Sequence, residues 1–223
     1  MLVAGDLITK CAITLKDPEF VRWSQDELLM YLDEAQRDIA RNPGAYVKTI
    51  VLPMVEGTKQ ALPEDSNQLM TVVRNYDGEE PREPVRLTTR ELLDAFEPHW
   101  HVSPKHQVVE NYIYDDRNPT VFFVYPPNDG TGAVEIQYNA VPPKITQLTD
   151  ELSIRDEFET PLMMYVLYRA YTKDSDYSSG LNLANTFFQS YVQGTTGVLQ
   201  ARGINTPNTA LVSGAVNSSG STE

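Results

Sequence analysis

Cysteine is almost absent from this sequence, and basic residues are few. The 223 residues include a single cysteine, Cys11, so no disulfide can form within the chain and no oxidising compartment is implied. Lysine and arginine number 18 against 31 aspartates and glutamates, which gives a net charge of −13. Because acid repels phosphate, this charge argues against a general nucleic-acid or anionic-membrane binder. It does not exclude a protein through which DNA moves without being bound.

Long apolar runs are also missing. No stretch approaches the ~18 apolar residues of a membrane span. The first six residues lack a basic region followed by an apolar run, so no secretory signal is readable. We therefore expect a soluble protein made in the cytoplasm, without a membrane partner. The 41% of apolar residues and the 12 tyrosines are enough to build a core, which argues against disorder throughout.

Enzyme motifs are absent: there is no phosphate-binding glycine loop, nucleophile elbow or dinucleotide fingerprint. The three histidines, His99, His101 and His106, lie close together in sequence, with carboxylates nearby. Such a group could hold zinc, which would suit a metal-dependent hydrolase. The segment lacks a helical i, i+4 histidine pair, and its two prolines indicate an irregular loop. We favour a polar loop at a subunit contact, and we expect no catalytic residue, metal or cofactor.

Helical periodicity marks both ends of the chain. The segments predicted to be helical are residues 3–15, 24–42, 154–173 and 180–201. The second has the clearest start, because Ser24 and Glu27 have the spacing of a capping box and Trp23 precedes them as a candidate hydrophobic staple. Cys11 falls on the apolar stripe of the first helix and is expected to be packed. Gly194 and Gly197 are candidate kink positions in the last helix.

The middle of the chain changes to the two-residue period of strands. Strands are predicted at about 46–54, 58–62, 84–87, 107–114, 120–125 and 132–140, with a short apolar segment at 69–75. A hairpin is expected at Glu56-Gly57, and a short helix beginning at Thr88 and ending before Pro98. The predicted fold class is α+β: a helical body of about four helices with an inserted antiparallel β-meander. We expect a single domain over residues 1–202, with its β-rich insertion at about 45–142.

The last 21 residues, 203–223, contain no aromatic residue, lysine or arginine. Such a segment cannot bury enough apolar surface to offset its ordering entropy alone, so we expect a flexible C-terminal tail. Its apolar residues leave two interpretations open. The tail is either an idle disordered terminus or an arm that orders against a partner.

Several stretches together resemble the head-to-tail adaptor (connector) proteins of short-tailed bacteriophages. They include Val21-Arg22-Trp23-Ser24, Thr58-Lys59-Gln60-Ala61-Leu62-Pro63, Arg90-Glu91-Leu92-Leu93-Asp94, Phe123-Val124-Tyr125-Pro126-Pro127 and Tyr165-Val166-Leu167-Tyr168-Arg169. The likeness lies in their order and spacing over about residues 3–200.

The resemblance implies a non-enzymatic structural protein in the neck of the virion. Such adaptors form twelve-membered rings on the portal protein, continue its DNA channel and carry the tail nozzle protein. Double-stranded DNA would pass through without sequence-specific binding. A tail nozzle or stopper subunit is the neighbouring alternative, and the metal-dependent hydrolase is the alternative from another class.

Two sets of contact residues follow from this resemblance. Because adaptor C-terminal extensions run into crevices between portal subunits, the expected portal-contact residues are Ile204, Pro207, Leu211, Val212 and Val216. The candidate interface with neighbouring subunits or the tail comprises His99, Trp100, His101, Phe122, Phe123 and Tyr125. An ordinary role in the sheet core remains open for each of these aromatic residues.

Overall fold

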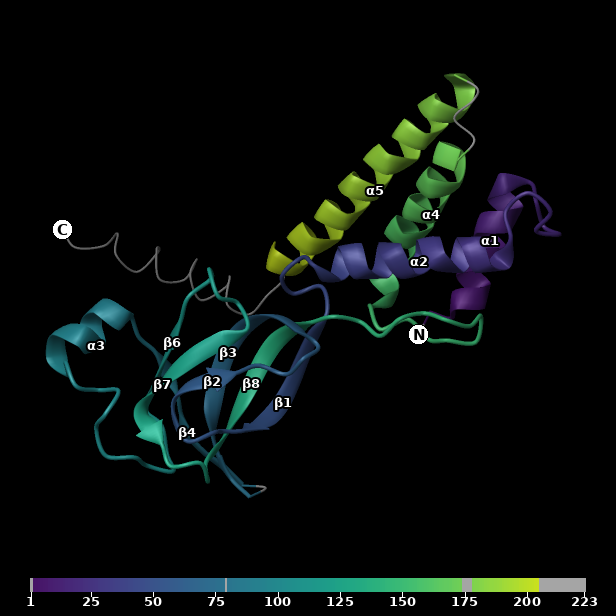
Figure 1. Ribbon diagram of the computed structural model, residues 1–223. Coiled ribbons are helices and arrows are strands. Elements are labelled where there is room, and N and C mark those ends of the chain that lie inside the picture. Colours follow the sequence, from purple (N-terminus) through teal and green to yellow (C-terminus); the bar gives the residue numbers. More distant parts are fainter. Residues whose placement is uncertain (1, 79, 174–177, 205–223) are drawn as a thin grey trace, which may run out of the picture. The chain divides into compact units, whose positions relative to one another are not determined.

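The computed structural model describes residues 2–78, 80–173 and 178–204 (Figure 1). The chain divides into two compact units. Unit 1 combines Met1–Ile39 with Pro143–Glu223, and unit 2 is Ala40–Pro142. Helices dominate the described part of unit 1, and strands dominate that of unit 2, which confirms the predicted α+β class.

Unit 1 contains the four helices that periodicity predicted, within its described residues. They are α1 (Ala4–Leu15), α2 (Gln25–Ala40), α4 (Glu159–Lys173) and α5 (Ser178–Ile204). A 3-10 turn at Asp156–Phe158 leads into α4. The apolar stripes face inward: Leu7, Leu32 and Leu162 are each at most 1% exposed. Their burial supplies the main driving force for folding this unit.

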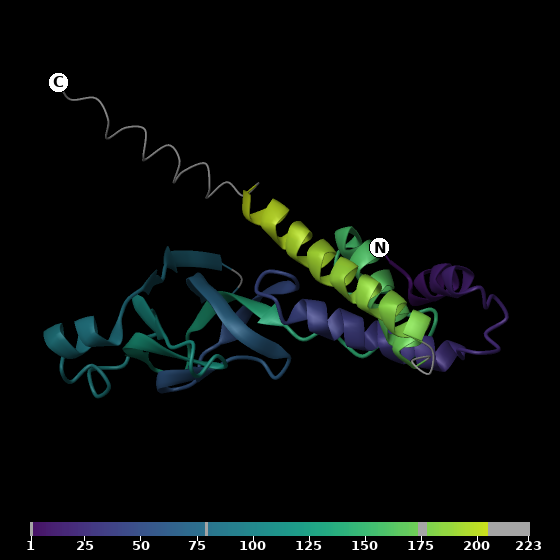
Figure 2. The same ribbon diagram turned by 90° about the horizontal axis from the view of Figure 1, so that it is seen from above.

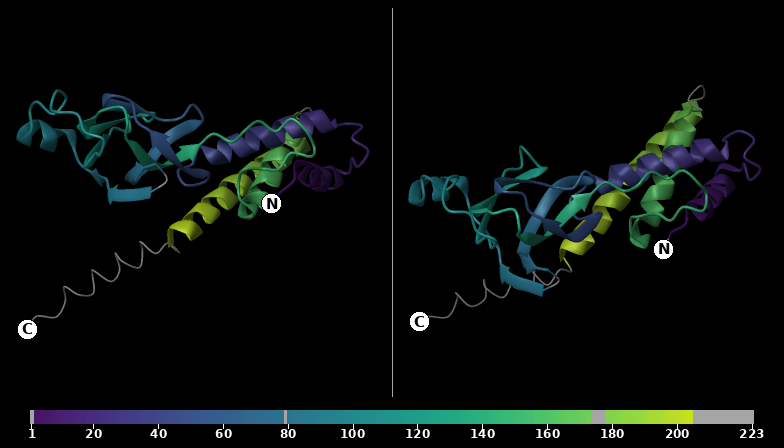
Figure 3. Two further views of the ribbon diagram at one scale, coloured as in Figure 1. Left: turned by 90° about the horizontal axis from the view of Figure 1, so that it is seen from below. Right: turned by 60° about the horizontal axis from the view of Figure 1, so that its bottom comes forward.

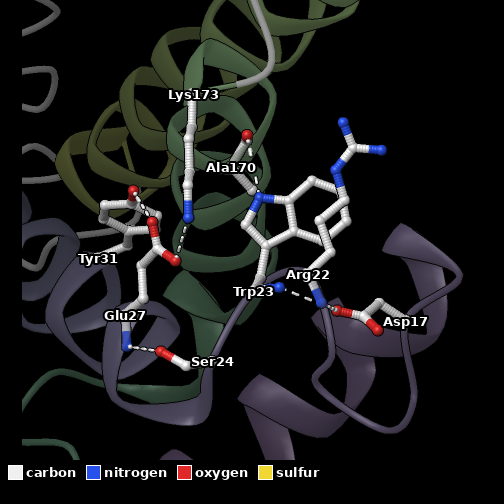
Figure 4. A network of polar contacts seen from close by, with 8 residues as sticks. All are labelled: Asp17, Arg22, Trp23, Ser24, Glu27, Tyr31, Ala170 and Lys173. Atoms are coloured by element: carbon white, nitrogen blue, oxygen red, sulfur yellow. Dashed lines mark hydrogen bonds and ion pairs between the residues drawn. The ribbon is translucent and has the colours of Figure 1, made fainter.

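The connection between α1 and α2 is organised by Asp17 (Figure 4). One carboxylate oxygen of Asp17 accepts a hydrogen bond from the backbone N–H of Val21 at 2.9 Å. The other accepts from Arg22 at 2.8 Å and from Trp23 at 3.0 Å. These backbone bonds, the one from Trp23 first, hold the pKa of Asp17 below its usual range. The turn therefore sets the position of Trp23 at the entrance to α2.

The predicted capping box at the start of α2 is half formed. The Ser24 hydroxyl accepts a hydrogen bond from the Glu27 N–H at 3.2 Å, as an N-cap does. The Glu27 carboxylate instead accepts from the Tyr31 hydroxyl at 2.8 Å and from Lys173 Nζ at 2.7 Å (Figure 4). Glu27 thus ties α2 to the end of α4.

Two buried polar residues of α2 hold the segment by which the chain returns from unit 2. Gln36, 1% exposed, donates to the Pro143 carbonyl at 3.3 Å and accepts from the Ser153 N–H at 2.9 Å. Asp33 accepts from the Ile145 N–H at 2.8 Å. Buried polar groups that are hydrogen-bonded in this way favour one position of the returning segment along α2.

Helices α4 and α5 lie side by side in all views (Figures 1, 2 and 3). Aromatic rings join them: Tyr165 to Tyr191 at 5.1 Å between centroids, and Tyr168 to Phe188 at 5.0 Å. α5 is helical throughout, including the two candidate kink positions, Gly194 and Gly197. A Cβ on Gly194 would lie 3.2 Å from Pro161 Cγ, so this glycine serves close helix approach.

Unit 2 contains two four-stranded sheets and one helix, α3 (Arg90–Phe96), among its described residues. The first sheet has the order β1 (Val47–Pro53), β8 (Ala133–Ala140), β3 (Ser66–Asp77), β4 (Glu80–Pro84). The second has the order β2 (Gly57–Ala61), β7 (Val121–Asn128), β6 (Asn111–Tyr114), β5 (Arg86–Leu87). A shared apolar core includes Phe122, Val124, Val134 and Ile136, each fully buried.

The predicted hairpin at Glu56-Gly57 and the predicted meander are wrong in their pairing. β1 pairs with β8 and β2 with β7, so the chain changes sheet at Gly57, and it changes sheet again between β7 and β8. Among the described strands, only β3–β4 and β6–β7 are antiparallel neighbours in both sequence and space.

The crossing between β7 and β8 has a local cause. The Asn128 side chain donates to the carbonyls of His106 and Gln107, and it accepts from the Gly130 N–H at 2.8 Å. The Gly132 carbonyl accepts from the Met54 N–H at 2.9 Å, so β8 starts beside the end of β1. A Cβ on Gly132 would lie 2.2 Å from the Gln107 carbonyl oxygen, a space that only glycine fits.

Candidate interaction surfaces

The loop that follows α3 is fixed by Trp100. Its side chain is 2% exposed, and its indole N–H donates to the Asp94 carboxylate at 2.8 Å. This hydrogen bond is the main cause of the lowered pKa of Asp94. The His101 ring stacks on Trp100 with 3.5 Å between centroids, and its Nδ1 lies 2.9 Å from the Thr58 hydroxyl. Trp100 is therefore a core residue of the loop, while His101 covers it.

The three histidines are not brought together as a group of metal ligands in the described residues. In the parts of the chain that the structure describes, no group of three or more histidine, cysteine or acidic side chains is arranged to hold a metal ion. His101 is engaged with Trp100 and Thr58. His106 bonds through its backbone, with its N–H donating to the Pro127 carbonyl at 2.8 Å. His99 is exposed.

The aromatic residues of β7 alternate between two faces of the sheet. Phe122 is 0% exposed in the core that the two sheets share. Phe123 and Tyr125 are partly buried and pack on a smaller cluster of Leu93, Trp100 and Ile113. Phe122 and Trp100 are thus inaccessible to a partner. Of the six candidate interface residues, His99, His101, Phe123 and Tyr125 retain exposed surface.

Sequence reasoning missed an exposed apolar side of α3. Leu92 is 51% exposed and Phe96 75% exposed, one helical turn apart, and Val102 in the following loop is 80% exposed. Apolar residues exposed together indicate an interaction surface. The i, i+4 spacing of Leu92 and Phe96 was visible in the sequence. The sequence did not show that this pair faces solvent, because that depends on Leu93, which is the residue of α3 that packs into the core.

The outer face of α5 is the most unusual surface of unit 1. In the 27 residues of α5, Arg202 is the one charged residue. Leu181, Phe188 and Val192 are each more than 40% exposed at spacings of seven and four, so they follow one side of the helix. Surface helices normally carry charged residues on the face turned to water. We call this side the α5 face; its other exposed residues include Asn185, Gln189 and Thr196.

The proposed portal-contact residues lie almost entirely beyond the described chain. Ile204 is the last residue of α5, whereas Pro207, Leu211, Val212 and Val216 lie outside the described residues. Their contacts with a portal remain a prediction.

Cys11 is buried in α1, as its place on the apolar stripe predicted. Burial raises the pKa of its thiol to about 12. Since the thiolate is the reactive form, the native protein should react with a thiol reagent such as DTNB at pH 8 far more slowly than the urea-unfolded protein. Equal rates in the two states would contradict the packing of α1.

None of the described helices is long and apolar enough to cross a membrane. No curated protein matches the chain. The family model of the SU10 adaptor protein, by contrast, matches residues 4–211, which include both units. The match agrees with the order of stretches from which the adaptor resemblance was inferred, and it extends through the α5 face. The chain therefore belongs to the SU10 adaptor protein family, a family of structural bacteriophage adaptors.

Proposed function

We propose that this protein is a ring subunit that joins the capsid portal to the tail and continues the DNA channel in the neck of the virion. Copies of the chain, twelve in the expected ring, meet side by side. One side of the ring binds the portal protein and the other the tail nozzle protein. Residues 1–202 act as one adaptor domain, and the tail from 203 is the portal-docking arm.

The proposal rests on the α5 face, an uncharged and partly apolar surface in a chain that matches the adaptor family model. A subunit with a net charge of −13 is repelled by its own copies unless they meet through an uncharged surface. The α5 face offers such a surface, with exposed Leu181, Phe188 and Val192 and no charge before Arg202. Depletion of charge with retained aromatic and aliphatic residues is typical of the centre of a protein interface.

The same negative charge suits a channel that lets DNA through. Phosphate groups are repelled by an acidic lining, so DNA would slide without being held. The tail, residues 203–223, is uncharged until Glu223 and rich in small residues. Such a segment fits a narrow groove, where the cost of ordering each copy is offset by the joint binding of many copies.

Mixing the full chain with its portal protein and imaging the particles by electron microscopy tests the proposal. We expect rings on the portal with the unmodified chain and few or none with Val192→Glu, because a carboxylate is desolvated in the contact. Ile13→Glu is the matched control, since Ile13 is an aliphatic residue 64% exposed on α1. No rings with the unmodified chain, or equal loss with both variants, would refute the assignment of the α5 face.

The tail is tested separately by ending the chain after Arg202. We expect this truncated chain to lose most of its portal binding while its helix content, measured by circular dichroism, is retained. Portal binding equal to that of the full chain would show that the arm is dispensable.

A further inference from the structure

Strand β1 is an edge of the first sheet (Figure 1). The Ala140 N–H donates to the Tyr46 carbonyl, and the Met54 N–H donates to the Gly132 carbonyl. In an antiparallel pair hydrogen bonding alternates, so the even-numbered residues of β1 bond to β8. The N–H and C=O groups of Val47, Thr49 and Val51 are therefore directed away from β8. Among the described residues they have no other backbone or side-chain partner.

The opposite edge of the same sheet is protected, whereas β1 is open. β4 has the sequence Glu-Pro-Arg-Glu-Pro, and proline and charge are the usual means of blocking a sheet edge. In β1 the only proline is Pro53, at its end. Its only charged residue is Lys48, whose ammonium is bound to the Asp65 carboxylate at 2.6 Å. Neither blocks the three outward residues.

The three outward residues, Val47, Thr49 and Val51, have the order valine, threonine, valine in either direction along the strand. We propose that β1 binds β1 of a second copy of this chain, antiparallel, about a two-fold axis through Thr49. Thr49 then faces Thr49 of the second copy, and Val47 faces Val51. Each of these pairs exchanges backbone N–H···O=C bonds, and the two four-stranded sheets become one of eight strands.

The side chains of this register are compatible on both faces. On the outer face, Val47 and Val51 are 40% and 42% exposed, and pairing forms two valine–valine contacts, one on each side of the central Thr49 pair. On the inner face, Tyr46 faces Leu52 of the second copy and Lys48 faces Ile50. Tyr46, Ile50 and Leu52 are partly buried at the border of the core, so the second copy completes their cover. Aromatic–aliphatic and β-branched pairs of this kind stabilise sheets, and no two like charges stand directly opposite.

This contact differs in symmetry from the contact in a ring. A two-fold pair uses the same surface on both copies, whereas neighbours in a closed cyclic ring meet through two different surfaces. The β1 pair is therefore a state of the free subunit, and it does not depend on the proposed ring or on the portal.

Cysteine cross-linking of the full chain tests the register. Thr49→Cys should give disulfide-linked dimers under mild oxidation, because Cα atoms in a hydrogen-bonded antiparallel pair are about 5.5 Å apart, within disulfide range. Cys11 is buried and does not compete. Met70→Cys, on β3 and 44% exposed, is the matched control and should cross-link about tenfold more slowly or less. Val47→Cys alone should also be slow, while a mixture with Val51→Cys should be fast.

Sedimentation velocity provides the test without a covalent bond. The unmodified chain should show a monomer–dimer equilibrium with rising concentration. Thr49→Pro removes the central N–H and should shift the chain to monomer, and an outward N–H of an edge strand can be lost without unfolding. Thr49→Val keeps the N–H and should still dimerise, with circular dichroism confirming the fold of both variants. A purely monomeric unmodified chain, or cross-linking of Thr49→Cys no faster than that of Met70→Cys, would overturn the proposal.

Discussion

Replacing Trp23 with alanine should lower the free energy of unfolding of unit 1 by about 3–5 kcal/mol, the range for truncating a large buried aromatic residue. The Trp23 side chain is 4% exposed between the α1–α2 turn and α4. Its indole N–H donates to the Ala170 carbonyl at 3.2 Å, and its ring meets Tyr171 edge-on at 6.4 Å between centroids. Alanine would leave a cavity and remove the hydrogen bond from the indole to the Ala170 carbonyl, which Figure 4 shows.

Urea unfolding followed by the circular dichroism of the helices measures this loss. Trp23→Phe separates the two contributions, because phenylalanine keeps most of the ring and removes the N–H. We expect it to cost about 1–2 kcal/mol, the value of one buried hydrogen bond with some loss of packing. A loss below about 1 kcal/mol for Trp23→Ala would mean that Trp23 does not anchor α2 to α4.

Gly132→Ala should destabilise unit 2 by about 1–3 kcal/mol or more, the usual cost of forcing an extra carbon into a filled space. The added Cβ would lie 2.2 Å from the Gln107 carbonyl oxygen and 2.5 Å from the Asn128 amide nitrogen. Both neighbours are fixed, since the Asn128 amide already donates to the Gln107 carbonyl at 2.9 Å. The fluorescence of Trp100, followed in a Trp23→Phe background during urea unfolding, reports on this unit.

Gly197→Ala is the matched control for this substitution. Nothing lies within 4 Å of a Cβ at Gly197, and the residue is inside α5. The same chemical change should there stabilise the helix by about 0.5–1 kcal/mol, because alanine loses less backbone entropy than glycine. A stabilising or neutral Gly132→Ala would show that the crossing from β7 to β8 can shift to make room.

The helices could be predicted from the sequence because their information is local. The stripe of α2 and its N-cap Ser24 lie within one window of the chain, and the structure places both as the periodicity indicated. The role of Glu27 could not be predicted, since its partner Lys173 is 146 positions away. A capping motif shows where a helix begins, and tertiary contacts decide how its side chains are used.

Strand partners could not be predicted for the same reason. The sequence around Glu56-Gly57 has the composition of a hairpin, and the chain bends at Glu56. β1 and β2 lie in different sheets because each pairs with a strand 60 or more positions later in the chain. Local propensity indicates that a segment is extended, but it does not indicate which strand the segment pairs with.

The candidate surfaces were predictable only in part. Alternation along β7 correctly implied that some of its aromatics are core, yet it did not identify Phe122 as the buried one and Phe123 as the partly exposed one. The missing charge of α5 was readable in the sequence, but its meaning depends on knowing which side of the helix faces water. The open edge of β1 required the pairing with β8.

The bonds from Gln36 and Asp33 to the returning segment have a consequence for synthesis of the chain. Residues 40–142 form one continuous stretch, so all of unit 2 can fold as soon as it has left the ribosome. Helix α2 is made earlier, but the carbonyl and N–H groups that satisfy Gln36 belong to Pro143 and Ser153. The apolar stripe of α2 and the Gln36 amide therefore remain exposed to solvent until unit 2, residues 40–142, has been translated. During that interval the nascent chain is most in need of a chaperone.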